Sequence, residues 1–190
     1  MSRGAGLGPV QRWREAWLRR RMPRPGREAP DFTLPLAGTG DEFLRLRDLR
    51  GRPLVLLFFP FAFSPGCCNE IEDFTARYPD FASRGAQVVG ISTDSPYALR
   101  AWADRYQVPF PLASDYNRRV IRRYGVAISR WGLGDFADRA VFVLDERGVV
   151  RWVWRAPDLG YLPDPDQVLA HLPDPPGDRP GPAGHRPGRR

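Results

Sequence analysis

The sequence contains no lysine, few cysteines and histidines, and no long hydrophobic run. A membrane-spanning helix needs roughly 18 consecutive apolar residues, and no segment approaches that length. The arginine-rich stretch 17–23 is not followed by the apolar core of an export signal. The two cysteines, Cys67 and Cys68, are adjacent and so cannot form a framework of spaced structural disulfides. We therefore expect a cytoplasmic protein with reduced thiols and no membrane association.

The basic residues are all of one type, and they outnumber the acidic residues. All 29 basic residues are arginine, the net charge is +7, and the arginines crowd towards both ends of the sequence. No zinc-finger spacing, RNA-binding aromatic motif or helix-turn-helix pattern accompanies them, so we do not expect nucleic-acid binding. His171 and His185 lie far apart and lack cysteine or acidic partners at ligand spacing. The sequence therefore predicts no metal and no cofactor.

Composition divides the chain into three parts. Residues 1–27 are an arginine-rich N-terminal extension in which Val10, Trp13, Trp17 and Leu18 recur at near-helical spacing, which predicts a short helix. That helix either docks a partner or second subunit, or packs on its own domain. Residues 28–172 have the apolar content of one domain, whereas residues 173–190 are mainly proline, glycine and arginine and are expected to be disordered.

The pattern of the middle part is that of an α/β protein. The apolar run 53–59 predicts a buried central strand, and 87–92 predicts a second strand. Residues 95–106 have helical apolar spacing, and 140–144 and 149–154 read as a hairpin across the turn 145–148. Strands that alternate with helices and close with a hairpin predict a mixed central sheet flanked by helices.

Cys67 lies where the predicted central strand passes into a helix. The first turn of a helix offers free backbone N–H groups and the positive end of the helix dipole, and both favour a thiolate. Ser64 places a hydroxyl three residues before the sulfur, and Pro60 closes the strand. These features favour a reactive cysteine over the alternative, a small buried residue without chemical function.

Pro60, Ser64 and Cys67 match the motif Pro-x-x-x-Thr/Ser-x-x-Cys, and the sequence here resembles the peroxiredoxins. Further segments agree in order, namely 29–34, 90–94, 110–115, 124–126 and 139–145, so that the resemblance covers about residues 29–170. The stretch Phe58 to Ser64 is most similar to the one-cysteine alkyl hydroperoxide reductase E group. The resemblance implies a thioredoxin-like fold with peroxiredoxin insertions.

It also implies a thiol-dependent peroxidase that reduces hydrogen peroxide and organic hydroperoxides. The Cys67 thiolate would attack the distal peroxide oxygen and become a sulfenic acid. Ser64 and the Cys67 N–H would stabilise the oxygens, and Arg139, directly before the strand 140–144, matches the family's active-site arginine. Glu70 would orient an arginine or stabilise the start of the helix, and Pro60 would wall the pocket. Three aromatic residues would flank the pocket or contribute to a homodimer face: Phe61, Phe63 and Trp131.

Recycling of Cys67 depends on the second thiol. Cys68 is adjacent, and a disulfide between neighbours in a helix is strained. The family's resolving cysteine, when it lies in this helix, comes five residues after the nucleophile, and Glu72 occupies that place. We therefore predict a one-cysteine enzyme with Cys68 as a bystander or auxiliary thiol. Its reductant would be an external thiol or redoxin, with mycothiol and mycoredoxin, thioredoxin or glutathione as candidates.

Two other functions use the same cysteine. A peroxide-sensing regulatory protein would oxidise Cys67 without efficient turnover, and only turnover with a reducing system separates it from a peroxidase. A thioredoxin-like disulfide oxidoreductase would need Cys-x-x-Cys, and Cys67-Cys68 lacks that spacing.

Overall fold

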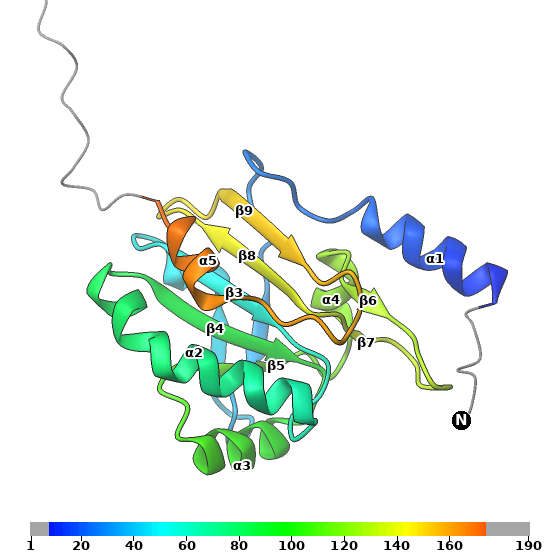
Figure 1. Cartoon of the computed structure of the whole chain (residues 1–190), viewed down its shortest axis with the longest axis horizontal. Coiled ribbons are helices and arrows are strands. Elements are labelled where there is room, and N and C mark those ends of the chain that lie inside the picture. Colours follow the sequence, from blue (N-terminus) through cyan, green and yellow to red (C-terminus); the bar gives the residue numbers. More distant parts are fainter. Residues whose placement is uncertain (1–7, 174–190) are drawn as a thin grey trace, which may run out of the picture.

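A five-stranded mixed sheet forms the centre of the structure, a computed structural model that describes residues 8–173 (Figure 1). The strand order is β5-β4-β3-β8-β9. Strands β3, β4 and β5 are parallel, while β8 runs antiparallel to β3 and β9 antiparallel to β8. Their bounds are β3 Leu54–Phe58, β4 Gln87–Ser92, β5 Leu112–Ser114, β8 Ala140–Leu144 and β9 Val150–Arg155.

Both faces of the central strand β3 are buried, which explains why it is apolar at every position. Side chains alternate between the two faces of a strand. Leu54, Leu56 and Phe58 accordingly belong to one core cluster, and Val55 and Leu57 belong to the other. A strand with two buried faces gains apolar burial at every residue, so its sequence reads as a continuous hydrophobic run.

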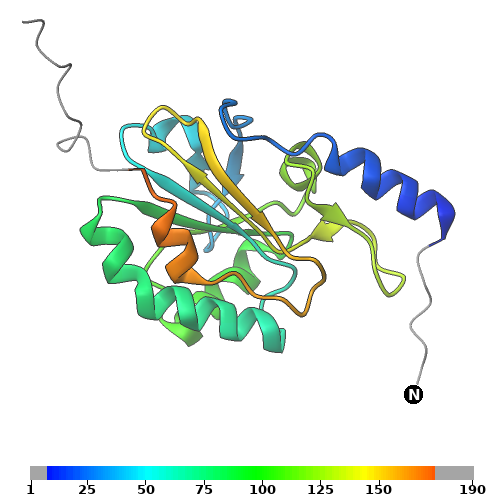
Figure 2. The ribbon, with the colours of Figure 1, turned by 45° about the horizontal axis from the view of Figure 1, so that its top comes forward.

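Three helices cover the face of the sheet that carries Val55 and Leu57, here called the second face (Figure 2). They are α2 (Pro65–Ser83), α3 (Pro96–Tyr106) and α5 (Pro165–Ala170). Along α2 the buried side chains include Cys67, Ile71 and Phe74, which lie at the three- and four-residue spacing of a core-facing helix. The Ser95 hydroxyl caps α3 by accepting a hydrogen bond from the Ala98 N–H at 3.2 Å.

The opposite face of the sheet, which carries Leu54, Leu56 and Phe58, is the first face, and short elements cover it. These are the hairpin of β1 (Thr33–Pro35) and β2 (Phe43–Arg45), the 3-10 helix η1 (Leu46–Leu49), the helix α4 (Arg119–Arg123) and the hairpin of β6 (Ala127–Ile128) and β7 (Phe136–Ala137). Tyr124, at the end of α4, packs its ring against Phe58 and Phe142 of the sheet. The N-terminal helix α1 (Pro9–Arg19) lies beside the β6–β7 hairpin, away from α2 and α3 (Figures 1 and 2).

The structure confirms the predicted mixed sheet flanked by helices. The N-terminal extension contains α1, and its Leu18 is buried in the core of the domain, whereas Val10, Trp13 and Trp17 are exposed. No helix within residues 8–173 is both long and apolar enough to cross a membrane. The predicted disordered segment lies outside the described residues from position 174 onward.

Candidate active site

The junction of β3 and α2 holds Cys67 in the first turn of the helix. Ser64 is the N-cap of α2, and its carbonyl accepts a hydrogen bond from the Cys68 N–H at 2.9 Å. The Ser64 hydroxyl donates to the Phe61 carbonyl at 3.1 Å. Cys67 itself has no exposed surface. The turn therefore fixes a hydroxyl and a buried thiol close together at the positive end of a 19-residue helix.

Sheet register brings Arg139 to this junction from far along the sequence. Phe58, the last residue of β3, pairs with Ala140, the first residue of β8, so Arg139 lies beside the exit of β3. Its Nη1 donates to Cys67 Sγ at 3.3 Å and forms an ion pair with Glu70. Its Nε donates to the Leu159 carbonyl at 3.0 Å. Glu70 and the Leu159 carbonyl thus hold the buried guanidinium against the sulfur.

Gly66 is needed for this arrangement because it leaves room for the guanidinium. A Cβ at position 66 would lie 2.6 Å from Nη2 of Arg139, which is closer than nonbonded atoms approach. Arg139 would have to shift to make that room, and the contacts of its Nη1 and Nε oppose such a shift. The lack of a side chain at position 66 therefore allows the guanidinium to lie against the start of α2.

The electrostatics of the site balance burial against one cation. Burial raises the pKa of the Cys67 thiol, Arg139 lowers it, the neighbouring Glu70 raises it and the Ser64 hydroxyl lowers it, with a net upward shift. Burial likewise raises the pKa of Glu70 to about 7, although Arg139 opposes the shift. Our expectation from the helix terminus alone was a favoured thiolate. Burial of Cys67 instead outweighs the effect of Arg139, so the pKa of the thiol is raised.

A cavity of about 390 Å³ opens next to Cys67. Its wall consists of Pro60, Phe61, Ser64, Gly66, Asn69, Trp131, Arg139, Leu159, Gly160 and Leu162. The ring of Trp131 stacks on Phe136 at 5.9 Å, and Phe136 in turn packs against Phe61 at 4.6 Å. One side of the cavity is therefore aromatic, while Arg139 and Ser64 supply the polar side.

Besides the two cysteines, the predicted site residues Phe63 and Glu70 do not line this cavity. Phe63 is 53% exposed and has a left-handed φ of 63°, so its ring lies on the surface of the loop. Glu70 is buried beneath Arg139, with one carboxylate oxygen paired to the guanidinium. Of the two roles considered for Glu70, the geometry favours orienting the arginine.

The second thiol points elsewhere. Cys68 is half-buried and forms no disulfide. It lies beside the Tyr106 hydroxyl of α3, and this contact is the main cause of the raised pKa of Tyr106. Cys67 instead contacts Arg139. The two neighbouring thiols thus have different surroundings.

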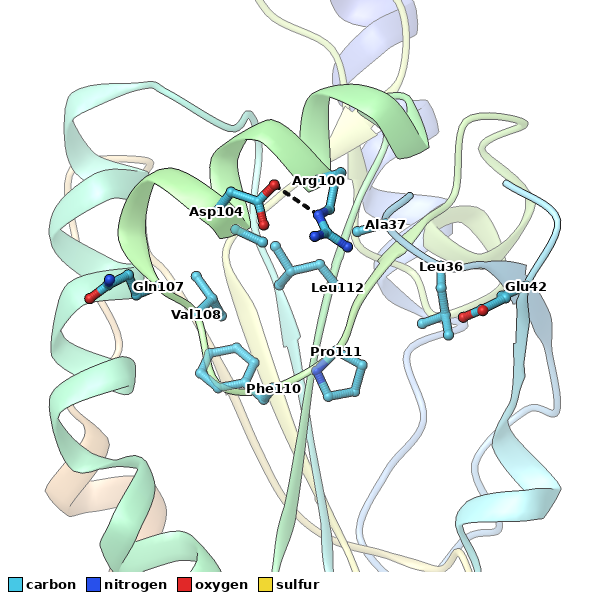
Figure 3. A pocket seen from close by; sticks show the side chains of 11 residues that line it. Leu36, Ala37, Glu42, Arg100, Asp104, Gln107, Val108, Phe110, Pro111 and Leu112 are labelled. Carbon is cyan, nitrogen blue, oxygen red and sulfur yellow. Dashed lines mark hydrogen bonds and ion pairs between the residues drawn. The ribbon is translucent and has the colours of Figure 1, made fainter. Parts of the chain in front are cut away.

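A larger cavity of about 520 Å³ lies at the far edge of the sheet, between α3 and the β1–β2 hairpin (Figure 3). Its polar groups include the Arg100–Asp104 ion pair and Glu42, and its floor is apolar. It contains neither cysteine nor histidine. Within residues 8–173 no three His, Cys, Asp or Glu side chains gather as a metal site. The larger cavity therefore offers no thiol, whereas the smaller one adjoins Cys67 through Ser64, Gly66 and Arg139.

Sequence reasoning missed the residue that supports the loop before α2. Asp94 accepts hydrogen bonds from the Ala62 N–H and the Ser92 hydroxyl, both at 2.8 Å. Because β3 and β4 are adjacent and parallel, their carboxyl ends meet at the same edge of the sheet. An acid two residues after β4 was thus a signal that could have been used. The Leu159 carbonyl left no such signal, since any residue has one.

A thioredoxin-like sheet with a buried cysteine at the start of a helix, paired with an arginine, defines a thiol-based redox protein. The sequence model of the AhpC/TSA family matches residues 25–153. A putative peroxiredoxin, bcp, of Coxiella burnetii is 36% identical over 132 residues, which are 68% of this chain and 86% of that protein. A putative peroxiredoxin of Mycobacterium tuberculosis H37Rv is 38% identical over 129 residues, which are 66% of this chain and 81% of that protein.

Among solved structures, peroxidoxin BcpB from Mycobacterium tuberculosis superposes with a TM-score of 0.71 at 32% identity, covering 79% of this chain and 96% of that one. The chain belongs to the AhpC/TSA family of peroxiredoxins. This confirms the predicted fold and the predicted thiol-dependent peroxidase function, and the relatives do not favour the purely regulatory alternative. The narrower likeness to alkyl hydroperoxide reductase E stays a prediction.

Proposed function

We propose that Cys67 is the nucleophile of the peroxidase and that Arg139, Ser64 and Pro60 complete its catalytic site. The observation that carries the proposal is the 3.3 Å contact between Arg139 Nη1 and the Cys67 sulfur. A buried thiol loses its proton only if a cation stabilises the thiolate, and Arg139 is placed to do so. Pro60 shields the site from one side as part of the cavity wall.

The reaction begins with the Cys67 thiolate and a hydroperoxide. The sulfur attacks the distal oxygen, so that a new S–O bond forms while the O–O bond breaks, and the distal OH passes to the sulfur as a sulfenic acid. The leaving oxygen takes up one proton and departs as an alcohol or water. Donors placed around both oxygens stabilise this transition state more than the ground state. Arg139 supplies such donors beside the sulfur, and the Ser64 hydroxyl supplies another when it turns from the Phe61 carbonyl.

The cavity wall supports a substrate range that includes organic hydroperoxides. Phe61 and Trp131 present apolar surface opposite Arg139, which suits the organic part of such a substrate. Because Cys67 is fully covered, a peroxide reaches the sulfur only when wall residues shift. Hydrogen peroxide needs less room, so both substrates are served by one site.

Recycling follows the one-cysteine scheme. The different surroundings of Cys67 and Cys68 support a sulfenic acid that waits for an external thiol. That thiol forms a mixed disulfide with Cys67, and a second thiolate releases the reduced enzyme. Mycothiol with mycoredoxin, thioredoxin and glutathione are the candidate reductants, and the adjacent reduced cysteines fit a cytoplasmic setting.

The enzyme is further proposed to form a homodimer. Large exposed apolar side chains near the cavity support this: Phe63, Trp131 and Leu133, each more than half exposed. Sedimentation equilibrium of the wild type and of Phe63→Ser tests this point. A monomeric wild type would refute the proposed dimer but would leave the proposed roles of Cys67 and Arg139 unaffected.

Peroxide consumption by two matched variants tests the nucleophile. With dithiothreitol as the reductant, Cys67→Ser is expected to lose all peroxidase turnover, because no thiolate remains beside Arg139. Cys68→Ser, a change of the same size on the neighbouring residue, is expected to keep the wild-type rate of the first oxidation. Full activity in Cys67→Ser would overturn the proposal.

A further inference from the structure

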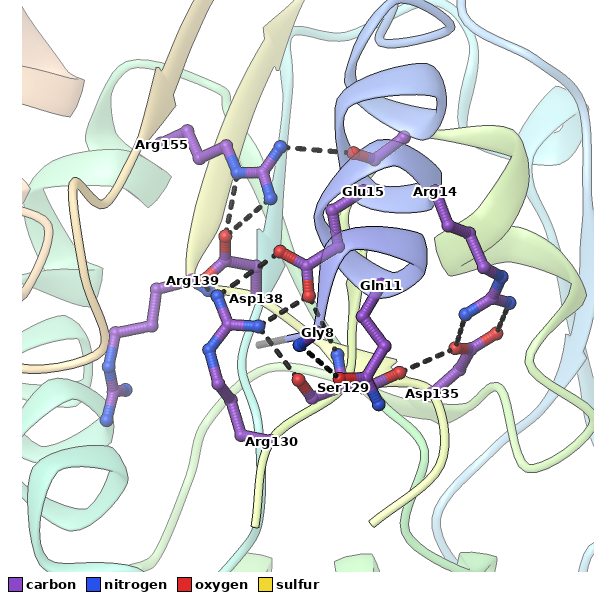
Figure 4. Close-up of polar contacts among 11 residues, drawn as sticks. Gly8, Gln11, Arg14, Glu15, Ser129, Arg130, Asp135, Asp138, Arg139 and Arg155 are labelled. Carbon is purple, nitrogen blue, oxygen red and sulfur yellow. Dashed lines mark hydrogen bonds and ion pairs between the residues drawn. The ribbon is translucent and has the colours of Figure 1, made fainter. Parts of the chain in front are cut away.

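The N-terminal helix lies outside the segment that matches the family, yet it contacts the loop that carries Trp131. The family match covers residues 25–153, whereas α1 spans Pro9–Arg19. The loop in question, residues 129–135, joins β6 to β7 and is held at both of its ends by side chains of α1 (Figure 4). The extension is thus connected to the active-site wall.

At the first end, Glu15 holds the start of the loop. Its carboxylate accepts a hydrogen bond from the Ser129 N–H at 3.2 Å and forms an ion pair with Arg130. The Glu15 side chain is only 8% exposed. Removing one partner of such a covered pair leaves the other charge poorly solvated, so this contact constrains the loop more than a surface ion pair would.

At the second end, Arg14 holds Asp135. The guanidinium pairs with both carboxylate oxygens, and Arg122 of α4 donates to the same carboxylate at 2.6 Å. The Ser129 hydroxyl also donates to Asp135 at 3.1 Å, which ties the two ends of the loop together. Burial raises the pKa of Asp135, but the two arginines outweigh burial and hold it at about 2. The carboxylate is therefore charged throughout the neutral range.

Between these two anchors lies Trp131. Its φ of 55° is left-handed, a conformation that a bulky residue keeps only when its surroundings impose it. The indole is 71% exposed and contacts the body of the protein by stacking on Phe136, with 7° between the ring planes. A weakly buried ring therefore forms part of the cavity wall while its loop is fixed from α1.

We infer that Glu15 and Arg14 are positioning residues that hold Trp131 in the cavity wall and thereby set the preference for organic hydroperoxides over hydrogen peroxide. The inference rests on the proposed role of Cys67 and its cavity. Hydrogen peroxide has no organic part and does not use the aromatic wall. An aryl hydroperoxide does, so misplacing Trp131 slows its reaction selectively.

The test compares rate constants for Cys67 oxidation by cumene hydroperoxide and by hydrogen peroxide in the full chain. Glu15→Gln and Arg14→Gln are expected to lower the ratio of the two constants about 10-fold, the size of effect that a lost apolar contact has on substrate discrimination. Arg12→Gln, an exposed arginine of the same helix, serves as the matched control and is expected to keep the ratio. Arg14 is 42% exposed, so its variant stays informative if Glu15→Gln folds poorly.

A cycle with Trp131→Ala separates positioning from a general loss of stability. Trp131→Ala alone is expected to lower the ratio, and adding Glu15→Gln to it is expected to change the ratio no further, because the effect acts through the indole. An unchanged ratio in both α1 variants, or an equal further loss in the Trp131→Ala background, would overturn the inference. Failure of Cys67 to react with either peroxide in the wild type would instead refute the proposed function.

Discussion

Arg139 contacts two acidic partners at once, so the proposed site shares one cation between them. Its Nη1 contacts both the Cys67 sulfur and the Glu70 carboxylate, and all three groups are buried. One cation cannot fully stabilise two buried anions. A protonated Glu70 leaves the arginine to the thiolate, whereas an ionised Glu70 competes with it.

Replacing the arginine tests this sharing. Arg139→Gln is expected to raise the pKa of Cys67, because Arg139 lowers that pKa in the wild type. Thiolate absorbance against pH measures the shift, and oxidation at neutral pH is expected to slow in parallel. The double variant Arg139→Gln with Glu70→Gln guards against misfolding around an unpaired carboxylate. An unchanged thiol titration in both variants would show that another group stabilises the thiolate.

A second residue-scale prediction concerns Gly66. Gly66→Ala is expected to slow oxidation of Cys67 at least about 10-fold, since the new methyl group displaces the guanidinium and misplaced catalytic groups cost this much or more. Stopped-flow measurement with hydrogen peroxide checks the rate. An oxidation rate equal to that of the wild type would mean that the guanidinium shifts without loss.

For the helices and strands, the pattern of apolar residues predicted the core strands, but it did not predict which charged side chains contact one another. The run 53–59 predicted a buried central strand, and β3 is that strand. The spacing of Arg118, Arg119, Arg122 and Arg123 indicates no partner, yet Arg122 pairs with Asp135 and Arg118 donates to the Asp135 carbonyl at 2.7 Å. Sequence spacing says nothing about which loop folds over a helix, so such partners stay hidden.

The residues of the candidate site likewise fall into those that local sequence could place and those that it could not. Cys67 and Ser64 are close in sequence, and the strand-to-helix switch placed them correctly relative to each other. Arg139 is 72 residues from Cys67 and was placed by family resemblance; the register of β3 on β8 is what brings it there. The contacts of Glu15 and Arg14 with the loop after β6 had no sequence signal.

The attachment of α1 to the domain can be tested at Gly125. This residue has a φ of +70°, and a Cβ there would lie 2.5 Å from the Leu18 carbonyl oxygen at the end of α1. Gly125→Ala is expected to destabilise the protein by about 2–4 kcal/mol, the sum of backbone strain and a clash with main-chain atoms.

Gly85 offers a matched control with a φ of +69° and open space around its Cβ position. Gly85→Ala is expected to cost only about 1 kcal/mol, the strain alone. Urea denaturation compares the two variants. Equal losses would show that Gly125 is required only for its backbone conformation and not for the contact with α1.

For the whole molecule, the buried acids predict how stability depends on pH. Folding raises the pKa of Glu70 from 4.5 to about 7, so the folded chain binds this proton more tightly than the unfolded chain. The contribution is complete below about pH 4.5 and is lost as the pH rises through about 7, with a total on the order of 3 kcal/mol. Asp135 acts oppositely, and its contribution is lost only as the pH falls towards about 2.

Glu70→Gln removes the first of these dependences. Its free energy of unfolding is expected to vary less between pH 4.5 and pH 7 than that of the wild type. Burial also raises the pKa of Asp94 and Asp115, so some slope remains. Urea titrations at several pH values supply the comparison. The same slope in both proteins would contradict the shifted pKa of Glu70.

The central claim is that one thiol, Cys67, takes the oxygen from the peroxide and then waits for an external reductant. Mass spectrometry of the wild type after one equivalent of peroxide tests it most directly. We expect one added oxygen on the Cys67 sulfur, and then conversion of Cys67 to a mixed disulfide when a thiol is supplied. Loss of two hydrogens to a Cys67–Cys68 disulfide, formed faster than any adduct, would contradict it.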